Sequence, residues 1–355
     1  MSAGLKMRRV VQSSKLSRAA GMIAVVIVLA LVSAAGWGDR GLLSLLMEFF
    51  CYLALAQMWN LLAGFAGIVS LGQQAFLGLG GYALFFAALR LGWNPLEAFL
   101  LAGLAGAVVA IPGALVVFRL QGAYLAIGTW VVAEVLRLIF SQVAMLGAGS
   151  GISLPVAFAK SVKMAGLPRD AVLYLAALAL ALATIFASYM LLRSQRGLAL
   201  TAIRDNELGA RSSGVNSFTV KLMVFAATGL GTGLTGALLY LAKLRISPAA
   251  AFDVNWTSYM IFMVVIGGVG TLEGPIAGTL VYFVLRQYLA DMGSWYLIIL
   301  GVVAVTVMLR LPMGIWGTAA RKYDLSLFPT RRRVVFEEVT VAQQDRSRVP
   351  ETTAH

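Results

Sequence analysis

Long apolar stretches follow one another along most of this chain, and short polar segments separate them. A helix needs about 20 apolar residues to cross the hydrocarbon core of a bilayer. Read in that unit, the pattern predicts about ten spans, near residues 19–37, 42–64, 67–90, 95–118, 122–140, 171–192, 218–242, 256–272, 275–291 and 294–311. The predicted fold is an all-α, polytopic membrane helical bundle.

Basic residues flank these spans and predict their orientation. Residues 1–18 carry five Lys or Arg and no acid, and the tail 318–355 contains the run Arg331–Arg333. Positive charge beside spans marks the cytoplasmic side. We therefore expect a basic cytoplasmic N-terminus at 1–18, a transmembrane domain at 19–317, and a flexible cytoplasmic tail at 318–355. The run 19–36 is long for a cleaved signal peptide and predicts a retained first helix.

A polar island interrupts the apolar pattern at residues 193–217. It is basic, rich in helix formers, and places Glu207 four residues before Arg211, an orientation that favours a helical ion pair. We expect a helix ending at Gly214, held at the cytoplasmic face as a docking site for another protein. Its candidate contact residues are Arg196, Gly197, Ile203, Arg204, Asp205, Asn206, Glu207, Arg211 and Gly214.

The segment 141–170 is the longest predicted external loop. It is rich in Gly, Ser and Pro and is not apolar enough to span a membrane. A loop of this length is more often functional than a simple connector. We expect it to lie on the outer surface with a short interfacial helix.

Composition agrees with a membrane protein and excludes several kinds of chemistry. The chain is 60% hydrophobic and 12% charged, whereas soluble domains carry about 25% charge. Cys51 and His355 are the single cysteine and histidine, which argues against a metal site or a histidine-based catalytic centre. No lysine follows a glycine, so a Walker phosphate-binding loop is absent. The chain is predicted to be no enzyme and to bind no cofactor, so that energy would come from another protein.

The net charge of +13 is compatible with two kinds of acidic partner, anionic lipid and nucleic acid. Anionic lipid headgroups would suit the basic ends, since these ends flank the membrane. Nucleic acid ranks well below lipid, and no nucleic-acid partner is predicted.

Two glycine-dense stretches, at 64–81 and 267–278, share a short pattern. Each places a hydroxyl residue and a leucine, Ser70-Leu71 or Thr271-Leu272, before a polar residue and further glycines. Transporters are often built from internal repeats with broken helices at a central site. The pattern predicts a repeat of undetermined orientation, with helices unwound at Gly72 and Gly274. The alternative is close helix packing at two glycine ladders, Gly270/Gly274/Gly278 and Gly229/Gly233/Gly236.

Polar residues inside the predicted spans are candidates for a solute pathway. The predicted set is Asn60, Ser70, Gly72, Gln73, Gln74, Glu273 and Gly274. Gln73 and Gln74 could bind a polar solute or could equally bond other helices. Glu134 and Arg137 share a helical face and are predicted to form a structural ion pair rather than a ligand site. Glu48 and Arg286 also fall within spans.

Four blocks of sequence support a family resemblance over about residues 40–317. The first block is residues 59–82, WNLLAGFAGIVSLGQQAFLGLGGY. The others are RLQGAYLAI at 119–127 with EVLR at 134–137, residues 197–216 with the core AIRDNE, and IGGVGTLEGPIAG at 266–278. Together these blocks resemble the inner-membrane permeases of branched-chain amino acid ABC importers, specifically the M-type subunit.

The resemblance implies a bacterial inner-membrane subunit working with a sister permease, two ATP-binding cassette ATPase subunits and a periplasmic solute-binding protein. The island 193–217 would then be the coupling loop seated on an ATPase. Gln73 stands where many relatives carry histidine, so urea, short amides or another small polar solute remain alternatives to an amino acid. Outside this class, an ion-coupled secondary transporter would use intramembrane acids as ion sites. A membrane enzyme would need clustered His, Asp or Cys.

Overall fold

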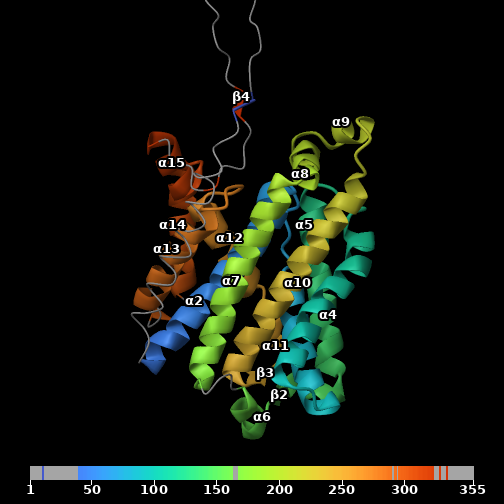
Figure 1. Cartoon of the computed structure of the whole chain (residues 1–355), viewed down its shortest axis with the longest axis vertical. Coiled ribbons are helices and arrows are strands. Elements are labelled where there is room, and N and C mark those ends of the chain that lie inside the picture. The colour runs from blue at the N-terminus through green and yellow to red at the C-terminus, as the bar shows by residue number, and fades with distance from the viewer. Residues whose placement is uncertain are drawn as a thin grey trace, which may run out of the picture.

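The computed structural model describes residues 10–11, 39–162, 167–289, 292–293, 295–323, 328 and 333–334 (Figure 1). Within these residues, eight helical stretches are long and apolar enough to cross a membrane: 40–65, 74–91, 95–117, 123–142, 169–193, 217–243, 248–267 and 295–323. Helix α13 (Gly274–Leu289) lies where another span was predicted but has 16 residues. The predicted polytopic helical bundle is confirmed. The span predicted at 19–37 lies outside the described residues.

The elements of the membrane domain follow the predicted spans closely. In chain order they are α2 (Arg40–Asn60) with the π-helical turn η1 (Leu61–Phe65), α3 (Gln74–Phe86) with η2 (Ala87–Leu91), α4 (Pro95–Val117), α5 (Ala123–Gln142), α7 (Arg169–Arg193), α10 (Ser217–Lys243), α11 (Pro248–Ala251), α12 (Asn255–Gly267), α13, α14 (Trp295–Arg310) and α15 (Gly314–Tyr323). Helices α8 (Gln195–Asp205) and α9 (Glu207–Ser212) lie together at one end of the bundle (Figure 1). This end is called the α8 end below.

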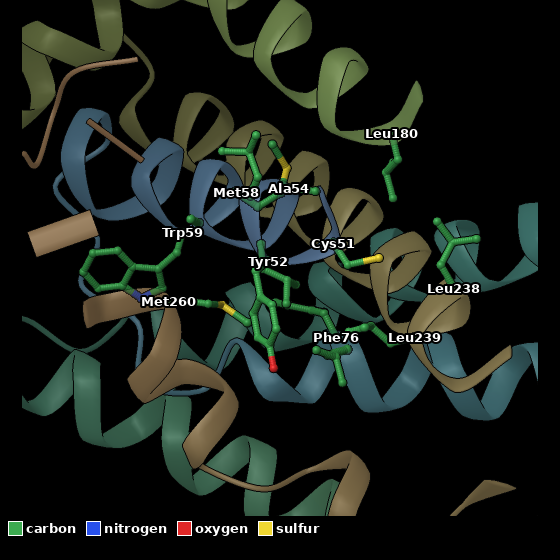
Figure 2. Close-up of a cluster of buried hydrophobic side chains, with 14 of the residues drawn as sticks. Cys51, Tyr52, Ala54, Met58, Trp59, Phe76, Leu180, Leu238, Leu239 and Met260 are labelled. Carbon is green, nitrogen blue, oxygen red and sulfur yellow. The ribbon is translucent and has the colours of Figure 1, made fainter. Parts of the chain in front are cut away.

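Helix α2 is the centre of the bundle. Every residue from Phe50 to Leu62 is buried, as expected for a membrane helix surrounded by other helices. Figure 2 shows side chains of α2 among Leu180 of α7, Leu238 and Leu239 of α10, Met260 of α12 and Phe76 of α3. Because α2 packs against α7, α10, α12 and α13, polar groups on its surface can hold distant segments together.

Glycines on α10 allow it to approach its neighbours backbone to backbone. A Cβ added at Gly233 would lie 2.8 Å from the Ala102 carbonyl oxygen of α4, and one at Gly236 would lie 3.0 Å from the Leu77 Cα of α3. Gly229 faces Gly106 of α4 in the same way. Close packing through small residues stabilises helix pairs in lipid. The packing interpretation of this ladder is therefore confirmed.

Both glycine-dense stretches contain a break between helices, which corrects two predicted boundaries. The span predicted at 67–90 begins only at Gln74, and the span predicted at 256–272 ends at Gly267. Gly67, Gly268 and Gly270 have φ values of +70°, +129° and +75°, where glycine is strongly favoured. We call residues 66–73 the first break and residues 268–273 the second break.

The second break also corrects two expectations for individual glycines. Gly274 is helical and begins α13, so the unwound residues precede it. Gly270 lies outside any helix, and Gly270, Gly274 and Gly278 therefore do not form one helical ladder. Gly278 packs instead on α12, where its added Cβ would lie 2.9 Å from the Gly267 nitrogen.

The two broken helices run in the same direction. The Tyr52 ring, in the second half of α2, lies 6.0 Å from the ring of Trp256, which is at the start of α12. Further along, Asn60 bonds the Thr271 carbonyl, and Gly64 lies against Gly270. Residue numbers rise together on both helices, so α2 and α12 are parallel. The repeat itself stays a prediction, but the two similar stretches meet side by side near the α8 end.

The loop between α5 and α7 closes the opposite end of the bundle. It contains the short turns η3 (Ala144–Leu146) and η4 (Ala148–Ser150), the predicted short helix as α6 (Val156–Ser161), and strand β2 (Ile152–Ser153). Strand β2 pairs antiparallel with β3 (Arg245–Ile246), which follows α10. Lys243, the last residue of α10, lies 5.2 Å from the Trp256 ring centre, where a cation–π contact stabilises its charge.

The predicted tail is partly structured. Its residues 318–323 belong to α15, which corrects the expectation that it is flexible from residue 318. Phe328 is buried, and its ring centroid lies 5.8 Å from that of Tyr189. Strand β4 (Arg333–Val334) pairs with β1 (Val10–Val11) beyond the α8 end (Figure 1). The remaining residues of 1–18 and 318–355 lie outside the described part of the chain.

Candidate functional site

The polar island folds into two short helices rather than the single predicted helix. Ser194 caps α8 by accepting from the Gly197 amide, and Asn206 caps α9 by accepting from the Gly209 amide, 2.9 Å away. Asn206 itself has extended backbone and therefore separates the two helices. Gly214, with φ +84°, lies just beyond α9, as predicted for a helix stop.

An ion pair fixes α9 to the start of α10. Glu207 accepts from Arg211 at 2.8 Å, which confirms the predicted pair. Its other oxygen lies 2.7 Å from Lys221 Nζ on α10, a partner that the local sequence did not reveal. Burial alone would raise the pKa of Glu207, but Lys221 and Arg211 outweigh it and the pKa is lowered. Glu207 is therefore charged at neutral pH.

One face of α8 and α9 is buried, and the other is open. The buried residues Gly197, Leu200, Ile203 and Ala210 face the bundle. On the open side, Leu198 and Leu208 are 47% and 77% exposed, and Arg196, Asp205 and Arg211 stand beside them. Exposed leucines among charges are typical of a protein contact surface.

Arg204 connects α8 to the first broken helix. Its Nη1 donates to the Gly64 carbonyl oxygen at 3.1 Å, although 140 residues separate the two positions. The side chain also runs along Gly67, where an added Cβ would lie 3.2 Å from Arg204 Cγ. Asp205 accepts from the same guanidinium at 3.1 Å. Arg204 therefore connects α8 directly to the turn where α2 ends.

Two amides of α2 hold the second break. Asn60 Oδ1 accepts from the Gly270 amide at 2.9 Å, and its Nδ2 donates to the Thr271 carbonyl at 2.8 Å. Gln57 Nε2 donates to the Leu272 carbonyl at 2.7 Å. Buried backbone groups outside helices need such partners in a membrane protein. Asn60 thus supports the break in this conformation, and Gln57, which the sequence interpretation missed, supports it beside Asn60.

Residues of the first break, and Gln74 directly after it, bond to threonines on three helices. Gln73 Nε2 donates to Thr232 Oγ1 of α10 at 3.0 Å, and Gln74 bonds Thr257 of α12 through both its amide nitrogen and its side chain. The Leu71 amide donates to Thr129 Oγ1 of α5 at 2.9 Å. Thr232 is near the middle of the 27-residue α10, so Gln73 lies deep in the bundle.

The predicted pathway residues are brought together but are enclosed. Asn60, Ser70, Gln73, Gln74 and Glu273 are all at most 7% exposed. Ser70 and Gly72 line a cavity of about 20 Å³ between α3, α4, α5 and α10, which is room for one water. Gln73 Oε1 is buried and has no hydrogen-bond partner in the described structure. In this conformation the residues surround a break rather than an open binding pocket.

Glu273 and the pair Glu134–Arg137 occupy different surroundings. Glu273 Oε1 accepts from the Phe328 amide at 2.8 Å, so it holds a residue of the tail. Arg137 Nε lies 2.9 Å from both carboxylate oxygens of Glu134 on α5, which forms the predicted ion pair. Glu48 of α2 pairs with Arg286 of α13 at 2.8 Å, which accounts for two further charges within spans.

Known proteins are similar in sequence to most of the membrane domain of this chain. The family model described as "Branched-chain amino acid transport system / permease component" matches residues 41–308, which include α2 to α14 and both breaks. The high-affinity branched-chain amino acid transport system permease protein LivM of Escherichia coli (strain K12) is 29% identical over 320 residues, covering 81% of this chain and 74% of the relative. The protein of the same name from Salmonella typhimurium (strain LT2) is 30% identical over 315 residues, covering 80% and 73%.

The matched region includes α8, α9 and both breaks. Its members are transport permeases rather than enzymes, in agreement with the composition of this chain. This multi-pass membrane protein belongs to the family of permease components of branched-chain amino acid transport systems.

Proposed function

We propose that this chain is the M-type permease subunit of an ATP-driven importer for branched-chain or related amino acids. The assembly would contain a sister permease, two ATP-binding cassette subunits and a periplasmic solute-binding protein. The chain would lie in the bacterial inner membrane with both termini and the α8 end in the cytoplasm. The names of the relatives, which specify branched-chain amino acid transport, support this solute class.

The observation that carries the proposal is the contact of Arg204 with Gly64. The open face of α8 and α9 would seat on an ATPase, and Arg204 would pass its displacement to the first break. Asn60 ties the first broken helix to the second break, so both would respond together. The chain itself makes or breaks no covalent bond, and its chemistry is conformational.

The buried polar residues at the first break would meet the solute when the bundle opens. Ser70 and Gly72 lie beside Leu71, Gln73 and Gln74, which are held by hydrogen bonds to α5, α10 and α12. Exchange of those partners would expose polar groups to a pathway. Such unwound segments are tolerated inside a membrane where protein or water covers them. Glu273 and Gly274 would play the same part at the second break.

The test is uptake by the complete transporter in vesicles. The genes neighbouring this one would be expressed with it, and uptake of labelled leucine, isoleucine, valine and urea would be measured with ATP supplied. We expect ATP-dependent uptake of an aliphatic amino acid. Uptake that follows a proton or sodium gradient and survives loss of ATP would instead establish a secondary transporter. ATP-dependent uptake of urea alone would show that urea, rather than an amino acid, is the transported solute.

A charge-reversed variant tests the coupling surface within that assay. Reversal of Arg204, Asp205 and Glu207 together should abolish uptake while the protein remains inserted and ATP hydrolysis persists. Reversal of Glu97, a capping residue of α4 at the opposite end, is the matched control and should leave coupling unchanged. Normal uptake by the triple variant would overturn the assignment of α8 and α9 as the coupling loop.

A further inference from the structure

Helix α5 is the least covered span on one side of the bundle. In its most apolar stretch only 11% of the residues are buried, compared with 67% for α10. Its inner face holds Thr129 and Ala133 against the bundle. Its outer face exposes Tyr124, Ile127, Trp130, Val131, Val135, Leu138 and Ile139. A surface of this kind faces either lipid or another membrane protein.

The ion pair between Glu134 and Arg137 is part of this open surface. The guanidinium bonds both carboxylate oxygens, yet the Arg137 and Glu134 side chains remain 32% and 40% exposed. The two charges neutralise each other, but their outer edges have no further partner within the described residues of α5 or its neighbours. They are available to another polar group.

The depth of the pair argues against a lipid environment. Glu134 is the twelfth of the 20 residues of α5, so it lies about 18 Å along a helix of about 30 Å. That position is near the middle of the hydrocarbon core, where exposed ionic groups are costly and normally face protein or water. A pair near a helix end could reach the headgroups, whereas Glu134 is too deep for its short side chain to do so.

Two other open helices show what a lipid-facing surface looks like in this chain. Helix α4 exposes Leu100, Leu104, Val108, Ile111 and Leu115, and its single charged residue, Glu97, is in its first turn. Helix α14 exposes Ile298, Val302 and Val305, and its single charged residue, Arg310, ends it. Both are apolar throughout their middle. Helix α5 differs from them in the ion pair alone, so the pair marks a different neighbour.

We propose that the outer face of α5 is the surface on which the second permease subunit of the transporter packs. This inference rests on the proposed function and names the part of the chain that meets that partner. The partner must itself lie within the membrane, because the pair is central, and it must offer apolar side chains to Val131, Val135 and Leu138. It must also bring a polar side chain or an unwound backbone segment to the ion pair.

The inner face of α5 contacts the first break, opposite the proposed interface. The Leu71 amide donates to Thr129 Oγ1, and a Cβ at Gly72 would overlap the Thr129 backbone. One helix therefore separates the first break from the proposed interface. A solute pathway between two permeases would run along this helix, within reach of the break.

The experiment is photo-crosslinking in the complete, membrane-embedded transporter. Cys51 is the single cysteine and is buried, so Cys51→Ala gives a cysteine-free chain whose uptake is checked first. A benzophenone probe is then attached to a cysteine placed at Val131, Val135 or Leu138. Matched controls carry the probe at Val108 of α4 and Val302 of α14. Adducts are identified by mass spectrometry.

We expect the α5 probes to yield adducts with the second permease at least fivefold more often than the α4 and α14 probes, which should label lipid. Adducts of α5 with lipid, with another copy of this chain or with residues 19–37 of this chain would overturn the inference. ATP-dependent uptake and co-purification of the ATPase are measured in the same preparation. If both are present without α5 adducts, this inference alone fails; if both are absent, the proposed function fails and the inference falls with it.

Exchange of the two charges tests the role of the ion pair directly. The double variant Glu134→Arg/Arg137→Glu keeps an intrahelical pair but reverses its direction. We expect at least a tenfold loss of co-purified second permease, while the ATPase stays bound through α8 and α9. Assembly equal to wild type would show that the pair serves α5 alone and would refute its recognition by a partner.

Discussion

Removal of the Arg204 side chain provides the sharpest test of how the α8 end is coupled to the membrane. Arg204→Ala deletes the 3.1 Å hydrogen bond to the Gly64 carbonyl and the packing along Gly67, while the helix α8 itself keeps its cap. We expect this change to leave the bundle folded, because the core around α2 does not include Arg204. The expected defect is in coupling.

The size of the effect follows from the geometry of the contact. A hydrogen bond from a charged group contributes roughly 1.5–3 kcal/mol when it is buried. The Arg204 side chain is 34% exposed, so solvent screening reduces the contribution of this hydrogen bond to about 1.4 kcal/mol, just below that range. That energy corresponds to about a tenfold change in an equilibrium. Uptake per ATP hydrolysed should therefore fall about tenfold.

The assay is simultaneous measurement of ATP hydrolysis and leucine uptake by the reconstituted transporter. Arg204→Lys, which keeps a donor but loses the planar fork, should recover part of the uptake. Ser213→Ala is the matched control in the same loop, because the described side-chain hydrogen bond of Ser213 goes to the Gly209 carbonyl within that loop. Asp205→Ala removes the exposed pair with Arg204 and should change uptake less than twofold.

Two results would refute this reasoning. Uptake within twofold of wild type in Arg204→Ala would show that the Gly64 contact transmits nothing. A loss of uptake matched by an equal loss of bound ATPase would show that Arg204 acts in docking rather than in transmission.

Three further changes test other parts of the site. Gly64→Ala places a Cβ 2.6 Å from the Gly270 nitrogen and should lower the free energy of unfolding by about 1–3 kcal/mol and reduce uptake. Gly301→Ala, which has no atom within 4 Å of the added Cβ, should do neither. Equal behaviour of the two variants would contradict close contact of the breaks. Gln73→Ala and Gln74→Ala should reduce uptake more than membrane abundance, and a fall in abundance alone would make both residues packing elements. Glu207 has a lowered pKa, so its ion pairs stabilise α9 fully above about pH 4.3, and this stabilisation is lost as the pH falls from that value towards the lowered pKa. A spin label at Ser212 should therefore gain mobility over that pH range. Glu207→Gln should remove the pH dependence.

The sequence predicted the spans well because lipid imposes a simple rule on them. An apolar run of sufficient length has few alternatives to a helix, so α4, α7 and α10 begin and end within two residues of the predicted limits. The breaks were placed less well. Ile68, Val69 and Leu71 are apolar enough to continue a helix on paper, and the positive φ values of the surrounding glycines appear only in three dimensions.

The partners within the site could not be read from the sequence for a different reason. Asn60 and Thr271 are 211 residues apart, and nothing local indicates that α2 and α12 lie side by side and parallel. Threonines in helices commonly bond their own backbone, as Thr129 does with the Ala126 carbonyl, so they gave no signal of their role at the first break. The role of Gln57 at the second break had a weak signal in the sequence, since Gln57 precedes Asn60 by three residues and lies on the same helical face.

The first break connects the two surfaces proposed for partners. Arg204 contacts Gly64 and Gly67 near the α8 end. Leu71 and Gly72, four and five residues after Gly67, rest on Thr129 of α5. A shift of α8 could therefore be transmitted through a short non-helical segment to α5, the helix on which the second permease would pack. Coupling of this kind requires an element with two arrangements that both sites bias, and the first break is the element in contact with both. If it has that role, ATP binding should change the adduct yield of a probe at Val131, and Arg204→Ala should abolish the change while leaving the basal yield intact.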